Sequence, residues 1–180
     1  HIYEIIEPSS EPVKQALYRL EPEPFFEDAS RLLNHSHVEN NYDDTALQPQ
    51  LPRRLDRSGP GVAWLDYDND GDDDLLVGAG AGSAVVVYKN MGDGRFGVVS
   101  GAAGLKLPGD MVSACGWVDS SGRRTWLAAV TNYESPRSRA RLMTFRKSGG
   151  LSRSGKSLED IMPGPIAVAD VDADGDLDVF

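Results

Sequence analysis

Residues 61–77, GVAWLDYDNDGDDDLLV, place an acidic loop between two short apolar segments. A second stretch of the same kind, IAVADVDADGDLDVF, occupies residues 166–180. Both contain the pattern D-x-D-x-D-G-x-x-D, starting at Asp66 and at Asp170. Short apolar runs bounded by Gly and Asp are typical of β-strands. Each stretch is therefore predicted to form a strand, an acidic turn and a second strand.

The apolar segment before the acidic loop recurs along the chain. Residues 61–66 (GVAWLD), 114–119 (ACGWVD) and 165–170 (PIAVAD) align, and their final Asp residues lie 53 and 51 positions apart. A period near 50 residues is typical of a β-propeller, in which each blade is a sheet of about four antiparallel strands. The fold class predicted is all-β, a partial propeller of about two to three blades. Further strands are expected at 75–77, 84–88, 95–99, 126–130 and 141–145.

The repeat predicts four segments. Residues 1–57 form a Pro-punctuated lead-in, 58–110 a blade with an acidic loop, 111–163 a degenerate blade without one, and 164–180 the truncated start of a further blade. Short helices are expected in the lead-in near 13–20 and 26–33. Its apolar residues, Phe25, Phe26, Leu32 and Leu33, are expected to pack on the first blade, since disordered segments rarely contain such clusters.

The acidic loops have the chemistry of a calcium site. Ca²⁺ takes six to eight oxygen ligands at about 2.3 to 2.6 Å, and Gly at the sixth position permits the sharp turn around the ion. Mg²⁺ demands a stricter octahedron, and zinc or copper would need His or thiolate ligands. Positions one, three, five and nine should ligate through side chains and position seven through its carbonyl. The predicted metal residues are Asp66, Asp68, Asp70, Asp72, Asp74, Asp170, Asp172, Asp174, Asp176 and Asp178.

The acidic loops differ from an EF-hand and from the middle loop of the repeat. An EF-hand would have a bidentate Glu at position twelve and flanking helices, whereas position twelve from Asp66 is Val77 and the flanks are strand-like. The middle loop, which starts at Asp119, is two residues shorter and has lost the acidic series. We expect it to bind no calcium.

Charge and composition exclude several function classes. The net charge is −10, and the two acidic stretches hold eleven of the 28 carboxylates, without which the chain would carry +1. No basic nucleic-acid motif is present, so no nucleic-acid partner is expected. The longest apolar run, around 84–88, is far shorter than the roughly 20 residues that span a bilayer, so no membrane insertion is expected. The single Cys115 is expected to act as a small buried apolar residue.

Other candidate sites are weaker. His35 and His37 have no third His or Cys partner, so a surface loop is favoured over a zinc site. Neither a Gly-x-Ser-x-Gly elbow nor a P-loop is present, and no catalytic residue is predicted. Trp64 and Trp117 occupy the same place in the repeat, which favours core packing between blades over a sugar-stacking surface.

Longer motifs carry a family resemblance. Residues 61–77 and 167–179, with NMGDGRF at 90–96 and AAGL at 102–105, resemble the FG-GAP/VCBS repeat family, the calcium-loop propeller repeats also found in integrin α-chain heads. Three further motifs, HVENNYDD (37–44), LPRRL (51–55) and GPG (59–61), resemble sequences of the large bacterial VCBS-repeat proteins related to cartilage acidic protein. Those proteins often carry an ASPIC/UnbV segment.

The resemblance implies a function. Such a chain would be part of a secreted or cell-surface, calcium-stabilised, seven-bladed propeller that acts in adhesion or binds a protein or glycan, without enzymatic activity. A closed ring of seven blades would need about twice this chain, so a fragment of a longer protein is expected. Two alternatives remain open: a propeller lyase or oxidoreductase whose active site lies in missing blades, and a calcium-responsive switch.

Overall fold

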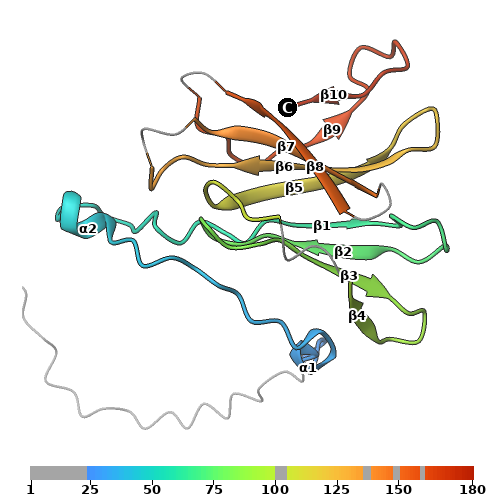
Figure 1. Ribbon diagram of the computed structural model, residues 1–180, viewed down its shortest axis with the longest axis horizontal. Coiled ribbons are helices and arrows are strands. Elements are labelled where there is room, and N and C mark those ends of the chain that lie inside the picture. The colour runs from blue at the N-terminus through green and yellow to red at the C-terminus, as the bar shows by residue number, and fades with distance from the viewer. Residues whose placement is uncertain (1–23, 100–104, 136–138, 148–150, 159–160) are drawn as a thin grey trace, which may run out of the picture.

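The structure is a computed structural model that describes residues 24–99, 105–135, 139–147, 151–158 and 161–180 (Figure 1). The helix expected near 13–20 lies outside the described residues. The described part is mostly β and is built from antiparallel sheets, which confirms the all-β prediction. No sheet of the described ranges closes on itself, so the propeller stays a prediction.

The first sheet contains the strands on both sides of the first acidic loop. It has four strands in the order β1-β2-β3-β4, every neighbour antiparallel. Its strands are β1 (Val62–Leu65), β2 (Asp74–Val77), β3 (Val86–Asn90) and β4 (Phe96–Val98). All residues of β2 are buried, because both faces of this inner strand are covered. That double burial explains why residues 75–77 are an unbroken apolar run.

The second sheet repeats this arrangement without an acidic loop. Its four strands follow the order β5-β6-β7-β8, all antiparallel. They are β5 (Met111–Val118), β6 (Arg124–Val130), β7 (Arg141–Lys147) and β8 (Leu151–Ser157). A third, two-stranded sheet pairs β9 (Val168–Ala169) with β10 (Asp178–Val179) around the second acidic loop. Figure 1 shows this hairpin beside the second sheet, on the side away from the first.

The first two sheets share one core. Leu65, Leu76 and Val87 from the first sheet belong to the same buried cluster as Trp126 and Phe145 from the second. The two sheets come closest where β1 passes β5, and a Cβ at Gly116 would lie 2.7 Å from the Trp64 carbonyl oxygen. Real Cβ atoms essentially never lie that close. Glycine at this position therefore permits the close contact between the sheets.

The tryptophans differ from the sequence expectation. Trp64 is 50% exposed and Trp117 only half-buried, whereas Trp126 is fully buried in the shared core. The core prediction is therefore wrong for Trp64. Side chains alternate between the two faces of a strand, and in β1 it is Ala63 and Leu65 that face the core. Trp64 lies on the opposite face, where its ring is 6.1 Å from that of Phe96.

The lead-in contains two one-turn helices, α1 (Ser30–Leu33) and α2 (Asp44–Leu47). The first lies inside the predicted range, and the second was not predicted. Leu33 packs against the cluster of Leu75, Val77 and Tyr88, as expected. The expectation is wrong for the two phenylalanines, because Phe25 and Phe26 are 98% and 90% exposed. One apolar residue, rather than four, anchors this end of the lead-in; Leu32 is 45% exposed.

The single cysteine can also be compared with the sequence expectation. Cys115 is half-buried rather than buried, and this burial raises the pKa of its thiol. Within the described ranges, no helix has the length and apolarity that crossing a membrane requires.

Candidate metal centre

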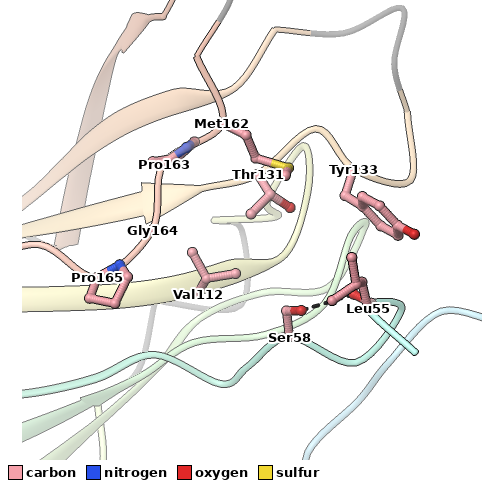
Figure 2. Close-up of a pocket in the computed structure, with 9 residues that line it drawn as sticks. All are labelled: Leu55, Ser58, Val112, Thr131, Tyr133, Met162, Pro163, Gly164 and Pro165. Atoms are coloured by element: carbon pink, nitrogen blue, oxygen red, sulfur yellow. Dashed lines mark hydrogen bonds between the residues drawn. The ribbon is translucent and has the colours of Figure 1, made fainter. Parts of the chain in front are cut away.

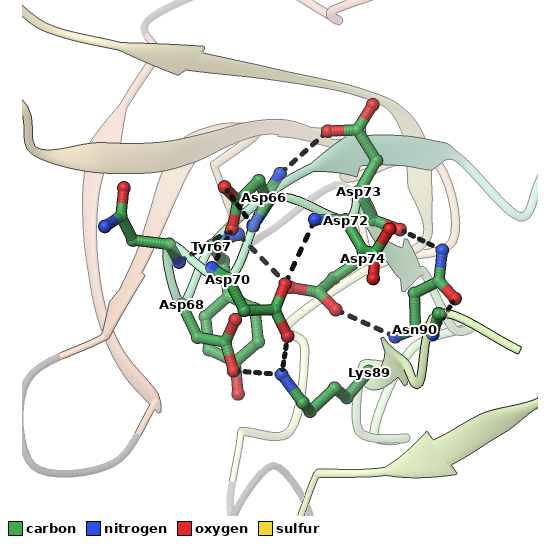
Figure 3. Close-up of polar contacts among 12 residues, drawn as sticks. Asp66, Tyr67, Asp68, Asp70, Asp72, Asp73, Asp74, Lys89 and Asn90 are labelled. Carbon is green, nitrogen blue, oxygen red and sulfur yellow. Dashed lines mark hydrogen bonds and ion pairs between the residues drawn. The ribbon is translucent and has the colours of Figure 1, made fainter.

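The first acidic loop brings three carboxylates together. One oxygen each from Asp66, Asp68 and Asp70 lies within 4.8 Å of the other two. The loop leaves β1 after Leu65 and enters β2 at Asp74, and these two residues are paired partners in the sheet. The sheet therefore holds both ends of the loop at a fixed separation. Figure 3 shows the carboxylates of Asp68 and Asp70 meeting at the Lys89 ammonium, with that of Asp73 pointing away.

Asp66 folds the loop through its own side chain. Its Oδ1 accepts hydrogen bonds from the backbone N–H of Asn69 (2.6 Å) and Asp70 (3.1 Å), and its Oδ2 accepts one from Gly71 (3.2 Å). The turn needs left-handed backbone at Asn69 (φ 67°) and Gly71 (φ 98°). Asn and Gly adopt this conformation more readily than other residues. The sequence DYDNDG, residues 66–71, therefore supplies both the bends and the acceptor.

A basic side chain lies where the carboxylates converge. The Lys89 Nζ, at the end of β3, lies 2.5 Å from Asp68 Oδ2 and also contacts Asp70 Oδ2. The hydrogen bond from Lys89 lowers the pKa of Asp70, and the two carboxylates raise the pKa of Lys89. The ammonium is a monovalent cation bound by the oxygens predicted to bind calcium. The donor set and its spacing thus fit a cation.

Asp74 has a different role from the other loop aspartates. Its side chain is fully buried, and its two oxygens accept backbone N–H groups of Tyr67 (3.2 Å) and Asn90 (2.8 Å). Burial raises the pKa of Asp74, although those hydrogen bonds oppose the rise. The side chain links the loop to the end of β3. Asp74 and Asp72 both lie outside the group of three converging carboxylates.

The second acidic loop gathers a slightly different set. Oxygens of Asp170, Asp172 and Asp178 lie within 4.8 Å of one another, and all three residues are exposed. Asp170 Oδ2 accepts from Gly175 N (3.0 Å), as Asp66 accepts from Gly71. Asp174 and Asp176 lie outside the group. No basic side chain of the described residues is ion-paired with this loop, so it has no counterpart of Lys89.

The middle loop is a compact turn with its own counter-ion. Asp119 Oδ1 accepts from the backbone N–H of Ser121 and Arg123, both at 3.0 Å, and Asp119 Oδ2 lies 2.8 Å from Arg123 Nε. The hydrogen bonds from Ser121 and Arg123 hold the pKa of Asp119 far below its usual range. That this loop binds no calcium stays a prediction.

Several contacts at the first loop were missed by sequence reasoning. Arg124, at the start of β6, reaches across from the second sheet: its Nη2 donates to Asn69 Oδ1 and lies 3.8 Å from Asp66 Oδ2. Lys89 and Asn90 come from the end of β3. If β2 and β3 are expected to pair, the end of β3 must lie beside the start of β2, so Lys89 and Asn90 could have been placed at the loop from the sequence. No local sequence pattern indicates that Arg124 contacts the loop.

The two histidines have separate partners. His35 Nδ1 lies 2.8 Å from the Tyr88 hydroxyl, and His37 Nε2 lies 2.5 Å from Glu39 Oε1. Both are half-buried and border a cavity of about 310 Å³ together with Lys106, rather than lying on an open surface loop. No three-ligand group containing a histidine occurs among the described residues.

A mostly apolar cavity of about 200 Å³ lies between the lead-in and the second sheet (Figure 2). The only hydrogen bond drawn among its lining residues runs from the Ser58 hydroxyl to the Leu55 carbonyl, 2.9 Å. Its lining residues are Leu55, Ser58, Val112, Thr131, Tyr133, Met162, Pro163, Gly164 and Pro165. Among the residues that the structure describes, none of those lining the cavity is an Asp, Glu, His or Lys.

No protein-family model, curated protein or solved structure matches the chain. The resemblance to FG-GAP/VCBS repeats therefore rests on the sequence motifs alone.

Proposed function

We propose that this chain is a calcium-binding, non-enzymatic β-propeller module that acts in adhesion or in binding a protein or glycan, outside the cell or at its surface. Each four-stranded sheet would be one blade. The observation that carries the calcium proposal is the convergence of oxygens of Asp66, Asp68 and Asp70 within 4.8 Å around a site already in contact with the Lys89 ammonium.

Calcium suits these loops better than other metals. The converging donors are all carboxylate oxygens, which hard cations prefer, and no His or Cys lies in either loop as zinc or copper would require. The three carboxylates of each loop leave room for backbone carbonyls and water, which the flexible coordination of Ca²⁺ accommodates. The side-chain ligands proposed are Asp66, Asp68 and Asp70 in the first loop, and Asp170, Asp172 and Asp178 in the second.

Calcium in the first loop would support the contact between the sheets. Tyr67, inside the loop, stacks on Trp126 of β6, and Arg124 reaches the loop from the same strand. Bound calcium would fix the loop in the conformation that makes both contacts. A structural role of this kind needs only the weak affinity of extracellular modules, about 10⁻⁴ to 10⁻³ M.

The cavity of Figure 2 supports binding rather than catalysis. Its volume of about 200 Å³ is below the roughly 300 to 1,000 Å³ of small-molecule sites. It suits one apolar side chain or sugar group of a larger ligand. Because none of its described lining residues is an Asp, Glu, His or Lys, the cavity favours a protein or glycan ligand over an enzyme substrate.

Thermal unfolding tests the calcium proposal. At free calcium 100 times the dissociation constant, each occupied site stabilises the fold by about 2.7 kcal/mol, which corresponds to a rise in Tm of about 5 to 11 °C for a chain of this size. Excess chelator should reverse the rise, and Asp68→Ala with Asp172→Ala should abolish most of it. Asp119→Asn, in the middle loop, is the matched control and should keep the full rise. An identical Tm with calcium and with chelator would contradict the proposal.

A further inference from the structure

A third acidic cluster lies in the lead-in, away from both D-x-D loops. Asp43 and Asp44, at the start of α2, meet Asp56, which lies just before the first sheet, and one oxygen from each lies within 4.8 Å of the others. Asp44 and Asp56 are each 2% exposed, whereas Asp43 is exposed. Carboxylates are almost never fully buried without compensating partners.

The two buried carboxylates are only half satisfied. Asp44 Oδ2 accepts from Leu55 N at 2.6 Å and from the Tyr133 hydroxyl at 3.5 Å, and Asp56 Oδ2 accepts from Arg54 Nη2 at 2.8 Å. The other oxygen of each, Oδ1, is buried and accepts no hydrogen bond. A buried acceptor without a donor is costly. Both carboxylates therefore keep an oxygen available for a ligand.

The charges in the cluster do not balance. Within the described part of the chain, Arg54 is the basic side chain ion-paired with it: its Nη2 lies 3.1 Å from Asp43 Oδ1, and its Nε lies 3.8 Å from Asp44 Oδ1. Three carboxylates against one guanidinium leave a net charge of −2, which one divalent cation would neutralise. The Arg54 side chain is 52% exposed, so it can withdraw into solvent when a stronger cation binds.

We propose that Asp43, Asp44 and Asp56 form a third divalent-cation site, selective for a hard cation such as Ca²⁺, with Arg54 as the internal cation that competes for it. The ligands are all oxygen atoms, which favours calcium over zinc or copper. Through Asp44 and its contacts with Leu55 and Tyr133, the ion would clamp the lead-in to the turn that follows β6, beside the cavity of Figure 2. The site does not depend on the two loops of the proposed function.

Calcium titration of the full chain, with both loops disabled by Asp68→Ala and Asp172→Ala, isolates this site. One equivalent of calcium should still bind in this background. Asp43→Asn, at an exposed position that tolerates the change, should weaken the remaining binding about tenfold, and the matched control Asp28→Asn should not. A background that binds no calcium, or binding that Asp43→Asn leaves unchanged, would overturn the site.

Arg54→Gln gives a second, opposite test in the same background. Removal of the competing cation should tighten calcium binding about tenfold. It should also lower the Tm in chelator, because the buried carboxylates lose their counter-ion, and calcium should restore that Tm. Unchanged or weaker calcium binding in Arg54→Gln would overturn the proposal. Loss of loop binding with retention of this site would instead count against the proposed function alone.

Discussion

Trp126 stacks on Tyr67, with ring centroids 5.3 Å apart and ring planes inclined by 28°. Tyr67 is the second residue of the first acidic loop, and Trp126 is a buried residue of β6 in the second sheet. The loop is therefore packed into the core that the two sheets share. Metal binding at Asp66, Asp68 and Asp70 would be coupled to the packing of the sheets through this pair.

Trp126→Ala should destabilise the protein by about 3 to 5 kcal/mol, the usual cost of truncating a buried aromatic residue. Trp126→Phe keeps a ring against Tyr67 and should cost less. Urea unfolding measures both values. The Ala variant should also bind calcium more weakly, because Tyr67 loses its packing partner. A loss below about 1 kcal/mol in Trp126→Ala would show that the stack does not join the loop to the core.

Lys89→Met should tighten calcium binding at the first loop about tenfold. The ammonium contacts Asp68 and Asp70, so calcium must displace it, and methionine keeps the apolar stem without the charge. In chelator the same variant should lose protection from hydrogen exchange in residues 66–73, since the carboxylates then repel one another. The second loop, with which no described lysine is ion-paired, should be unaffected. Weaker calcium binding would mean that Lys89 supports the site instead of competing for it.

Ala173→Asn should stabilise the protein by about 1 kcal/mol. Ala173 has left-handed backbone (φ 59°) at the position equivalent to Asn69 (φ 67°), and this conformation costs an L-residue with an apolar side chain about 1 to 2 kcal/mol. Asn relieves part of that cost. The reciprocal change, Asn69→Ala, should destabilise, and by more, because Asn69 also accepts a hydrogen bond from Arg124. Thermal melts of both variants in calcium check the signs; a lower Tm in Ala173→Asn would contradict the account.

His35 should make the stability of the folded protein depend on pH. Burial, and then the charge of His37, lower the pKa of His35 below its ordinary 6.5. The folded state therefore binds this proton less readily than the unfolded chain. The contribution of neutral His35 to the stability of the folded protein is fully present above about pH 6.5 and is lost as the pH falls toward the lowered pKa of His35.

The comparison between wild type and His35→Gln isolates this effect. Burial raises the pKa of Asp110 and of Glu134. The stability that these two groups contribute in their protonated form is lost as the pH rises, so their effect on the Tm opposes that of His35. The Tm of the wild type minus that of the variant should fall between pH 7.5 and 5.5. A difference that is constant with pH would show that His35 does not contribute.

The sequence predicted those features that local patterns determine. The D-x-D-x-D-G pattern located both acidic loops. The apolar runs located β2 and β6, because buried inner strands are continuous in their hydrophobicity. Trp64 was misassigned because repeat alignment gave its position in the strand but not the face that meets the core. Lys89 and Arg124 were missed because strand pairing and sheet packing bring them to the loop from distant positions. The cluster of Asp43, Asp44 and Asp56 likewise depends on how the lead-in folds back.

Calorimetric titration of the full chain with calcium tests the central claim most directly. The wild type should bind two more equivalents of calcium than the Asp68→Ala, Asp172→Ala variant, with dissociation constants of about 10⁻⁴ to 10⁻³ M. The same stoichiometry in both proteins, or no heat of binding up to about ten times that range, would contradict calcium binding by the two acidic loops.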